Sequence, residues 1–263
     1  MESAPTKAEV LRKERAPMKK NRKGSRPSMY IPIAALLIAI LTIFGIGVFL
    51  VIAEVEVTGA SMHTYEEIIE ISGIVPGDNM ILLDRNNIAQ RIIEELPYIN
   101  DARIHRVWPN TVRIEVTESM AIAAIPFYRG TLIVDSAGRV LEQRDEAPHG
   151  LVAVRGIYPT DPVPGRALTT EPDAAAWVNT LITMLTAIEE ADIQDDVLEL
   201  DITNPINITI RYLGRITVRL GGIDDIQNKL RLLPEAVEGL PPNQSGTFDM
   251  RDSSPANWRF QHN

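Results

Sequence analysis

The sequence predicts an α+β protein: one transmembrane helix, then a β-α-α-β-β module, then a β-rich module with two helices. Three observations predict this class. An uncharged apolar run of 23 residues lies near the N-terminus. A short region of mixed strand and helix patterns follows it. The remaining half alternates short strand patterns with two helical stripes, so each sheet has helices to cover one face.

Charge is distributed unevenly along the 263 residues, which include 26 Lys/Arg and 35 Asp/Glu. Residues 1–30 include nine basic and three acidic residues, and residues 31–53 include no charged residue. The remainder of the chain includes 17 basic and 32 acidic residues. The absence of cysteine excludes disulfides and thiolate sites. The four histidines are far apart and have no metal-ligand spacing. We therefore predict no metal and no cofactor.

The apolar run, Ile31–Ala53, is long enough to cross a bilayer. As a helix it would span about 35 Å, and a bilayer core requires about 20 apolar residues. The preceding cations are Lys19, Lys20, Arg22, Lys23 and Arg26. These place the N-terminus in the cytoplasm by the positive-inside rule and predict contact with anionic lipids. Residues 1–30 are predicted to be a disordered cytoplasmic tail.

Two other interpretations apply to this region. A cleaved signal peptide is disfavoured because the run exceeds the usual apolar length of about 7–15 residues. Nucleic-acid binding by the basic cluster is disfavoured because no aromatic residues are interleaved with it.

The β-α-α-β-β module is predicted to begin with a strand, Glu54–Thr58. Thr64 and Glu67 form a capping-box pattern at the first helix. Pro76-Gly77 predicts a type II turn, and Asp84 caps a second helix that ends at Pro97.

A hairpin then follows, with arms Ile99–Val107 and Thr111–Glu118. The second arm alternates apolar and polar residues, which is typical of a half-buried strand. Trp108 lies in the turn. We expect it to pack beside Pro109; if exposed, it would be a binding anchor.

The β-rich module is predicted from short strands at Ile122–Ile125, Thr131–Val134 and Arg139–Leu141, with a turn at Asp135–Gly138. The region Glu142–Thr170 is left unassigned. Further elements are a helix at Ala174–Ala191, three meander strands marked by Leu198/Leu200/Ile202, Ile206/Ile208/Ile210 and Ile216/Val218/Leu220, and a helix at Asp224–Val237 capped by Asp224.

The C-terminal segment holds the candidate binding residues. Thr247–Met250 is predicted to be the last strand and a candidate sheet edge, which either needs protection or accepts another strand. Trp258 and Phe260 lie in a polar tail, Asp252–Asn263, where an aromatic side chain has less reason to be buried. We weigh a docking role for them equally against packing.

No catalytic pattern is present. The sequence lacks nucleophile-elbow, phosphate-loop and dinucleotide motifs. Carboxylate pairs such as Asp195-Asp196 fall at predicted element ends, where capping or solvation explains them. We therefore predict no enzymatic activity and no small-molecule substrate.

The ordered features resemble the bacterial FtsQ/DivIB family. The residues that carry the resemblance are Val55–Gly59, Ser72–Asn79, Leu96–Ile99 with Ala102, Arg106 and Trp108-Pro109, Ile114–Glu118, Leu132–Asp135 with Gly138, Leu220-Gly221, Lys229-Leu230 and Phe248–Arg251. The resemblance covers residues 28–251. It implies a POTRA domain at 54–119, an FtsQ-type β domain at 120–251 and a C-terminal tail at 252–263.

The resemblance also implies a function. It indicates a non-enzymatic scaffold of the septal cell-wall machinery that binds FtsL and FtsB/DivIC-type partners at the cell membrane, at the division septum, with the C-terminal domains outside the cytoplasm. It places strand addition at Thr247, Phe248 and Met250.

Two alternatives remain open. One is a POTRA-bearing envelope assembly or secretion factor, although only one candidate copy and no barrel strands are present. The other is a membrane-anchored enzyme with an unrecognised site, which would need perturbed carboxylates in a deep pocket.

Overall fold

The computed structural model describes residues 30–128, 130–241, 243–252 and 254–262, with only the backbone described at residues 43, 44, 46–49 and 262. The predicted cytoplasmic tail up to residue 29, including its five lipid-contacting cations, lies outside the described residues. The chain divides into two units, Met1–Phe49 and Leu50–Asn263.

The first unit contains helix α2 (Tyr30–Phe49), a helix of 20 residues that, apart from Tyr30, belongs to the predicted apolar run. Thr42 donates a hydrogen bond to the carbonyl of Ile38 one turn earlier, so its hydroxyl is satisfied within the helix. Within the described part of the chain, no helix combines the length and apolar character needed to cross a membrane.

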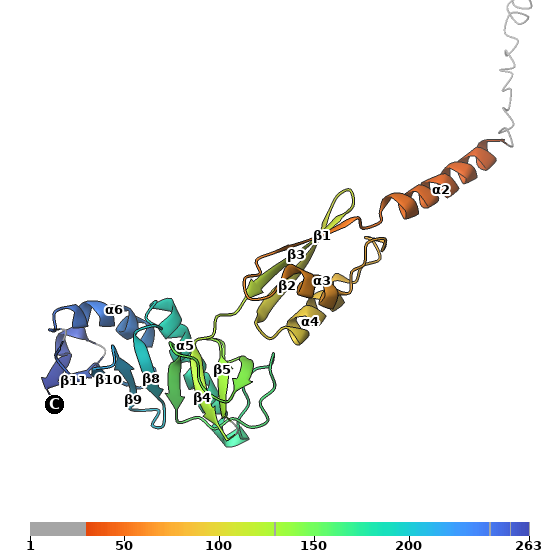
Figure 1. The fold of residues 1–263 in the computed structure, drawn as a ribbon. Coiled ribbons are helices and arrows are strands. Elements are labelled where there is room, and N and C mark those ends of the chain that lie inside the picture. The colour runs from red at the N-terminus through yellow and green to blue at the C-terminus, as the bar shows by residue number, and fades with distance from the viewer. Residues whose placement is uncertain (1–29, 129, 242, 253, 263) are drawn as a thin grey trace, which may run out of the picture. The chain divides into compact units, whose positions relative to one another are not determined.

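The second unit begins with the predicted β-α-α-β-β order, which is confirmed (Figure 1). Its elements are β1 (Glu54–Thr58), α3 (Tyr65–Ser72), α4 (Arg85–Glu95), β2 (Ile99–Val107) and β3 (Thr111–Glu118). The strands form a sheet of order β1-β3-β2, with β1 parallel and β2 antiparallel to β3. Ile68, Ile88 and Ile92 of the helices are buried in the same core as the sheet's inward side chains.

Both predicted helix caps of this module are present. Thr64 accepts a hydrogen bond from the Glu67 amide at 3.2 Å, and Asp84 accepts one from the Asn87 amide at 3.2 Å. These bonds satisfy amides that the first helical turn leaves unpaired. The Glu67 carboxylate contacts Nδ1 of His63 at 3.1 Å, a partner that the capping-box prediction did not foresee.

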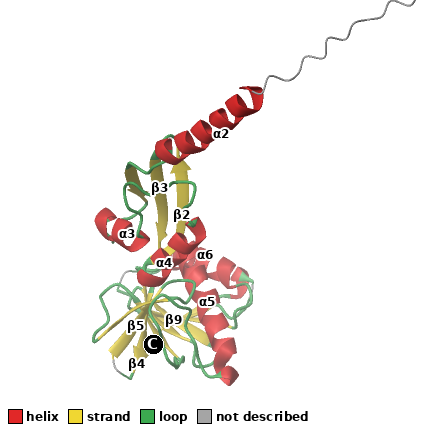
Figure 2. Ribbon diagram, turned by 90° about the vertical axis from the view of Figure 1, so that its right-hand side faces the viewer, coloured by secondary structure: helices red, strands yellow, loops and turns green. Residues whose placement is uncertain are grey.

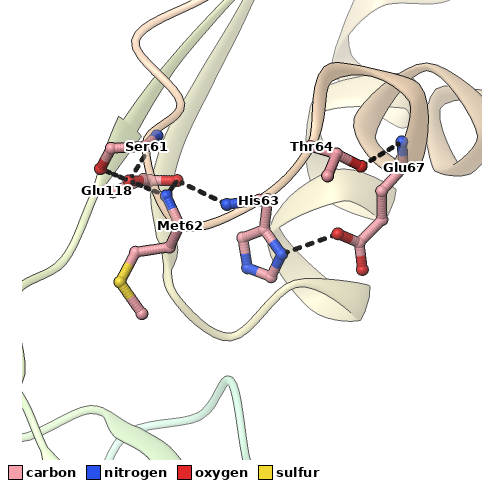
Figure 3. A network of polar contacts seen from close by, with 6 residues as sticks. All are labelled: Ser61, Met62, His63, Thr64, Glu67 and Glu118. Atoms are coloured by element: carbon pink, nitrogen blue, oxygen red, sulfur yellow. Dashed lines mark hydrogen bonds and ion pairs between the residues drawn. The ribbon is translucent and has the colours of Figure 1, made fainter.

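The loop after β1 is held by Glu118 at the end of β3 (Figure 3). Its carboxylate accepts hydrogen bonds from the Ser61 hydroxyl and from the amides of Ser61, Met62 and His63. Burial raises the pKa of Glu118, but these hydrogen bonds together outweigh it and hold the pKa below its usual 4.5. The ionised carboxylate therefore joins the loop to the sheet.

We expect Glu118→Gln to lower the stability of the protein at neutral pH and to weaken its dependence on acid. Because the folded-state pKa is depressed, the ionised group stabilises the fold above pH 4.5 and loses this effect as pH falls through the folded-state value. Urea unfolding above and below pH 4.5 measures both effects. The control variant is Glu95→Gln, because Glu95 is exposed at the end of α4. It should change neither the stability at neutral pH nor its dependence on acid appreciably. An acid profile unchanged by Glu118→Gln would contradict this role.

The rest of the second unit is a nine-stranded sheet of order β12-β11-β10-β9-β8-β7-β4-β5-β6. Its strands are β4 (Ala123–Phe127), β5 (Gly130–Val134), β6 (Val140–Arg144), β7 (Val152–Arg155), β8 (Val197–Asp201), β9 (Ile208–Tyr212), β10 (Ile216–Gly221), β11 (Gly246–Asp249) and β12 (Arg259–His262). The helical elements are η1 (Pro172–Ala174), α5 (Ala175–Glu190), α6 (Ile226–Glu238) and η2 (Pro255–Asn257). Helices α5 and α6 share one apolar core with this sheet (Figure 2).

Several boundaries differ from the predictions. Strand β7 lies in the unassigned region, and its Val152 and Val154 are buried. Leu198 is exposed because a register irregularity interrupts β8 between Val197 and Glu199. Ile206 precedes β9 and is also exposed. The residue before α6 is Asp225, with φ 58°, and it makes no side-chain cap, so the predicted cap at Asp224 is wrong.

Polar contacts join the two sheets within the second unit. The hydroxyl of Ser119 donates to buried Asp135 at 2.9 Å, and Tyr98 donates to Glu142 at 2.6 Å. The Arg139 guanidinium donates to the carbonyls of Ile93 and Ile99, both at 2.7 Å, and of Gly165 at 2.9 Å. Burial lowers the pKa of Arg139, while nearby Asp135 opposes this effect. One cation thus connects α4, the start of β2 and the loop before η1.

Candidate functional site

The C-terminal end of the large sheet is organised differently from the prediction. Strand β11 contains Thr247 and Phe248, but it is not the edge strand. The predicted tail folds back as η2 and β12, and β12 pairs antiparallel with β11, aligning Phe260 with Phe248. The edge of the sheet is therefore β12. The four residues of β12 carry no β-branched side chain, so local propensity gave little sign of a strand.

The five predicted contact residues gather around this corner. Phe248 is only 7% exposed and Met250 is fully buried, whereas Thr247, Trp258 and Phe260 are half-buried. The ring of Phe248 lies edge-on to Trp258 at 6.1 Å and tilted to Phe260 at 6.5 Å, measured between ring centroids. Packing in such geometries is favourable beyond area burial. Phe248 and Met250 are therefore core residues beneath the edge. Thr247, Trp258 and Phe260 are partly accessible at the protein surface.

The turn into β12 is built by Asp252. Its carboxylate accepts hydrogen bonds from the Ser254 amide and the Asn257 side chain, both at 2.8 Å. Its carbonyl accepts a bond from the Trp258 indole at 2.9 Å. The Ser254 amide, then Asn257, and also Lys229 lower the pKa of Asp252. These bonds orient the indole and start the return of the chain.

Gly246 permits the close approach of the last two strands. A Cβ at this position would collide with the carbonyl oxygen of Gln261 and the ring of Phe260. Glycine therefore lets β12 lie directly against β11.

A buried cation fixes the chain just beyond β11. Lys229 of α6 is 2% exposed, and its ammonium donates to the carbonyls of Leu220 at 2.8 Å and Arg251 at 3.4 Å. A buried ammonium is tolerated only when such acceptors replace water. Lys229 thus connects α6, the end of β10 and the segment leading to β12, a role that its position in a Lys-Leu pair did not reveal.

We expect Lys229→Met to lower the free energy of unfolding by about 1–3 kcal/mol, because the buried carbonyl of Leu220 loses its donor. Methionine keeps an unbranched chain that is one atom shorter, so the main loss is the polar contact of the ammonium. Chemical denaturation measures it. Arg231→Met, exposed on the same helix, should stay within about 0.5 kcal/mol of the parent. Equal effects of the two variants would contradict the assigned role.

A charged pair lies at the C-terminal end of β11. Arg251 and Asp249 form an ion pair at 2.6 Å. The side-chain hydrogen bond from Arg251 lowers the pKa of Asp249 against the opposing effect of burial. The pair presents two charges of opposite sign next to the aromatic corner.

The opposite edge of the sheet is partly covered. The amide of Val140 donates to Arg166 at 2.9 Å, and its carbonyl accepts from Gly165 at 2.8 Å. Arg139 also bridges to Ala167. The Pro/Gly-rich segment therefore occupies the start of β6, whereas no described strand lies beyond β12 in the sheet order. The two edges differ in their capacity to accept a strand.

Other candidate features contribute less. Among the described residues, no group of three or more His, Cys, Asp or Glu side chains could hold a metal ion. Trp108 is 62% exposed, so the expectation that it packs beside Pro109 is wrong. Tyr212, whose hydroxyl contacts Asp196 at 3.3 Å, has its pKa raised to about 12 by burial and by that carboxylate. This contact lies on β9, three strands from the edge.

Comparison with known proteins gives two family-model matches. A model described as "POTRA domain, FtsQ-type" matches residues 50–119. A second, described as "Cell division protein FtsQ/DivIB, C-terminal", matches residues 127–251. The first match covers the three-stranded module, and the second covers the large sheet from β5 to β11.

Curated proteins of the same description are similar to the chain. Cell division protein FtsQ of Corynebacterium glutamicum is 30% identical over 43% of this chain and 50% of its own length. Cell division protein DivIB of Clostridium tetani is 30% identical over 67% of this chain and 65% of its own. Cell division protein DivIB of Clostridium botulinum is 27% identical over 81% of this chain and 82% of its own length. The chain thus aligns with half to two thirds of the first two relatives.

Proposed function

The chain belongs to the FtsQ/DivIB family of cell division proteins, and from this premise we propose that it is a non-enzymatic, membrane-anchored scaffold of the division machinery. Its proposed partners are the FtsL and FtsB/DivIC-type division proteins. Through them it would help to control septal peptidoglycan synthesis. We also propose that residues 54–119 and 120–251 act as a POTRA domain and a β domain with separate roles.

The observation that carries this proposal is the edge formed by β12. A sheet edge presents backbone donors and acceptors that can pair with an incoming extended segment. Trp258 and Phe260 supply apolar contacts along the β12 edge. Thr247 lies on β11, the strand next to the edge. Phe248 and Met250 contribute by holding the aromatic corner in place.

The groove beside this edge supports the same proposal. Its volume is about 540 Å³, and it is lined by Leu232, Glu235, Ala236, Phe248, Pro255 and Trp258. An apolar groove next to an open edge can receive side chains of a partner whose backbone extends the sheet. The proposed partner is therefore an extended segment whose backbone pairs with β12. At least one of its apolar side chains would enter this groove.

Binding of the purified chain to the outer segments of the FtsL and FtsB/DivIC-type proteins of the same cell tests the proposal. Isothermal calorimetry should show a specific complex. Adding an unrelated extended peptide is the control. Absence of binding by the folded chain, in detergent and in vesicles alike, would overturn the scaffold role and favour an envelope enzyme or assembly factor.

We further propose that the predicted run Ile31–Ala53 anchors the chain in the cell membrane, at the septum, with the N-terminus cytoplasmic. The part in the bilayer would be Ile31–Phe49 of α2, because Leu50–Ala53 are hydrogen-bonded into the folded module. The support is the uncharged 23-residue run and the basic residues before it, Lys19, Lys20, Arg22, Lys23 and Arg26. Flotation of the full chain with vesicles after alkaline extraction tests the anchor. Replacing Leu41 by Arg should reduce flotation, because a charge at the centre of a span is costly.

A further inference from the structure

One end of the three-stranded sheet carries exposed apolar side chains. Val51, Val75, Ile81, Leu82 and Trp108 are all exposed, and we call them the apolar end. Leu82 is 81% exposed and Trp108 is 62% exposed. Such side chains scattered singly are normal on a soluble surface, but a contiguous group marks a contact surface.

Backbone hydrogen bonds hold the three contributing segments together. The amide of Ile52 donates to Asp78 at 2.9 Å, and the amide of Met80 donates to Leu50 at 2.9 Å. The amide of Ala53 donates to Asn110 in the hairpin turn at 2.8 Å. Segments 50–53, 75–83 and 106–110 therefore meet at one end of the sheet.

Sheet register gives the same placement. Glu54 at the start of β1 pairs with Thr111 at the start of β3, and Thr111 pairs with Val107 at the end of β2. The turn between β2 and β3 thus lies at the end of the sheet where β1 begins (Figure 1), and Trp108 belongs to this turn. The segments that carry the exposed side chains therefore meet where Leu50 begins the second unit.

The charges in these segments are engaged by the fold. Asp78 accepts a hydrogen bond from the Val75 amide at 3.0 Å. The Arg106 guanidinium donates to the carbonyls of Ile81 at 2.9 Å and Leu83 at 3.2 Å. Both side chains fix the loop that carries Ile81 and Leu82. The surface is thus apolar and held rigidly by its own polar contacts.

Chain connectivity identifies what covers this surface. Val51 follows the last residue of α2 by two positions and belongs to the same uncharged run, Ile31–Ala53. A bilayer that holds α2 would lie close to Val51, since the two are two residues apart and consecutive Cα atoms are about 3.8 Å apart. Tryptophan is enriched at the headgroup level of membranes, where one side of the ring is apolar and the other wet.

We propose that the apolar end lies in the headgroup region of the bilayer and seats the module on the membrane surface. The proposal rests on the membrane anchoring proposed above. It assigns Trp108 and Leu82 as lipid-contacting residues. The β-α-α-β-β module would then have a defined orientation relative to the membrane, and it would not rotate freely about its connection to the anchor.

Lipid quenching of Trp108 tests this surface. The full chain carrying Trp177→Phe and Trp258→Phe keeps Trp108 as its sole tryptophan. It is placed in phosphatidylcholine–phosphatidylglycerol vesicles that contain lipid brominated close to the headgroup. We expect Trp108 emission to shift to shorter wavelength and to lose intensity. A chain with Trp108→Phe and Trp258→Phe, which keeps Trp177 on α5, should show neither change.

A matched pair of aspartate variants extends the test. In the Trp108-only chain, Leu82→Asp should restore the lost emission, whereas Leu198→Asp, exposed on the large sheet, should leave it quenched. Flotation of the same samples separates the two proposals. If the chain floats but Trp108 is quenched no more than Trp177, the proposed lipid contact of the apolar end is wrong. The proposed membrane anchor is then still supported. Failure to float would overturn the anchor and this inference with it.

Discussion

A chain that ends at Asp252 is expected to lose most of its affinity for the FtsL and FtsB/DivIC-type partners, by about 30-fold or more. The deletion removes Trp258, Phe260 and the whole of β12. Removing the centre of an interface usually costs at least about 2 kcal/mol, and about 1.4 kcal/mol corresponds to a tenfold change. Calorimetric titration of the truncated and full chains measures the loss.

The control for this deletion is Gln261→Ala. Its side chain is exposed, and strand addition depends on the backbone, so the affinity should change little. Circular dichroism and thermal melting must show that the truncated chain is folded, because β11 then becomes the edge. A truncated chain that melts cooperatively and binds like the full chain would place the binding site elsewhere.

Phe248→Asp is expected to lower the free energy of unfolding by about 3–5 kcal/mol or more. Phenylalanine truncation in a core already costs this much, and the aspartate adds an unpaired buried carboxylate. Phe248 is 7% exposed and contacts both Trp258 and Phe260. The resemblance places Phe248 in the strand-addition site, and the burial of this ring means that the aspartate would also disturb the fold.

Phe248→Leu is the matched variant, since it keeps an apolar side chain of similar size and should cost less than about 1.5 kcal/mol. Urea denaturation gives both values. Partner binding measured where each variant is folded separates a structural effect from a contact effect. A stability of Phe248→Asp close to that of Phe248→Leu would show that the corner is not packed as described.

Local patterns predicted the first module almost completely. Its caps at Thr64 and Asp84 depend on contacts within a few residues, and the alternation in Thr111–Glu118 reports one buried face. Such signals are contained in the sequence itself. The same holds for the turn at Asp135–Gly138, where the Gly138 amide donates to Asp135.

The edge of the large sheet could not be predicted in this way. Strand β12 is four residues long and rich in polar side chains, and only pairing with β11 makes it a strand. The exposure of Leu198 follows from a register irregularity with β9, which is a tertiary property. The β7 pattern, Val152 and Val154 at alternate positions, did carry a signal that was obscured by the surrounding turns.

The segment that pairs with Val140 makes the two edges of this sheet unequal for growth by strand addition. Because Gly165–Ala167 pair with the chain at Arg139 and Val140, an added strand is obstructed at the start of β6, whereas no described strand lies beside β12. Growth from both sides, which open-ended fibres require, is therefore restricted by the chain itself. The expected stoichiometry is one partner strand per chain, and a second copy of this chain could pair through β12 only by competing with that partner.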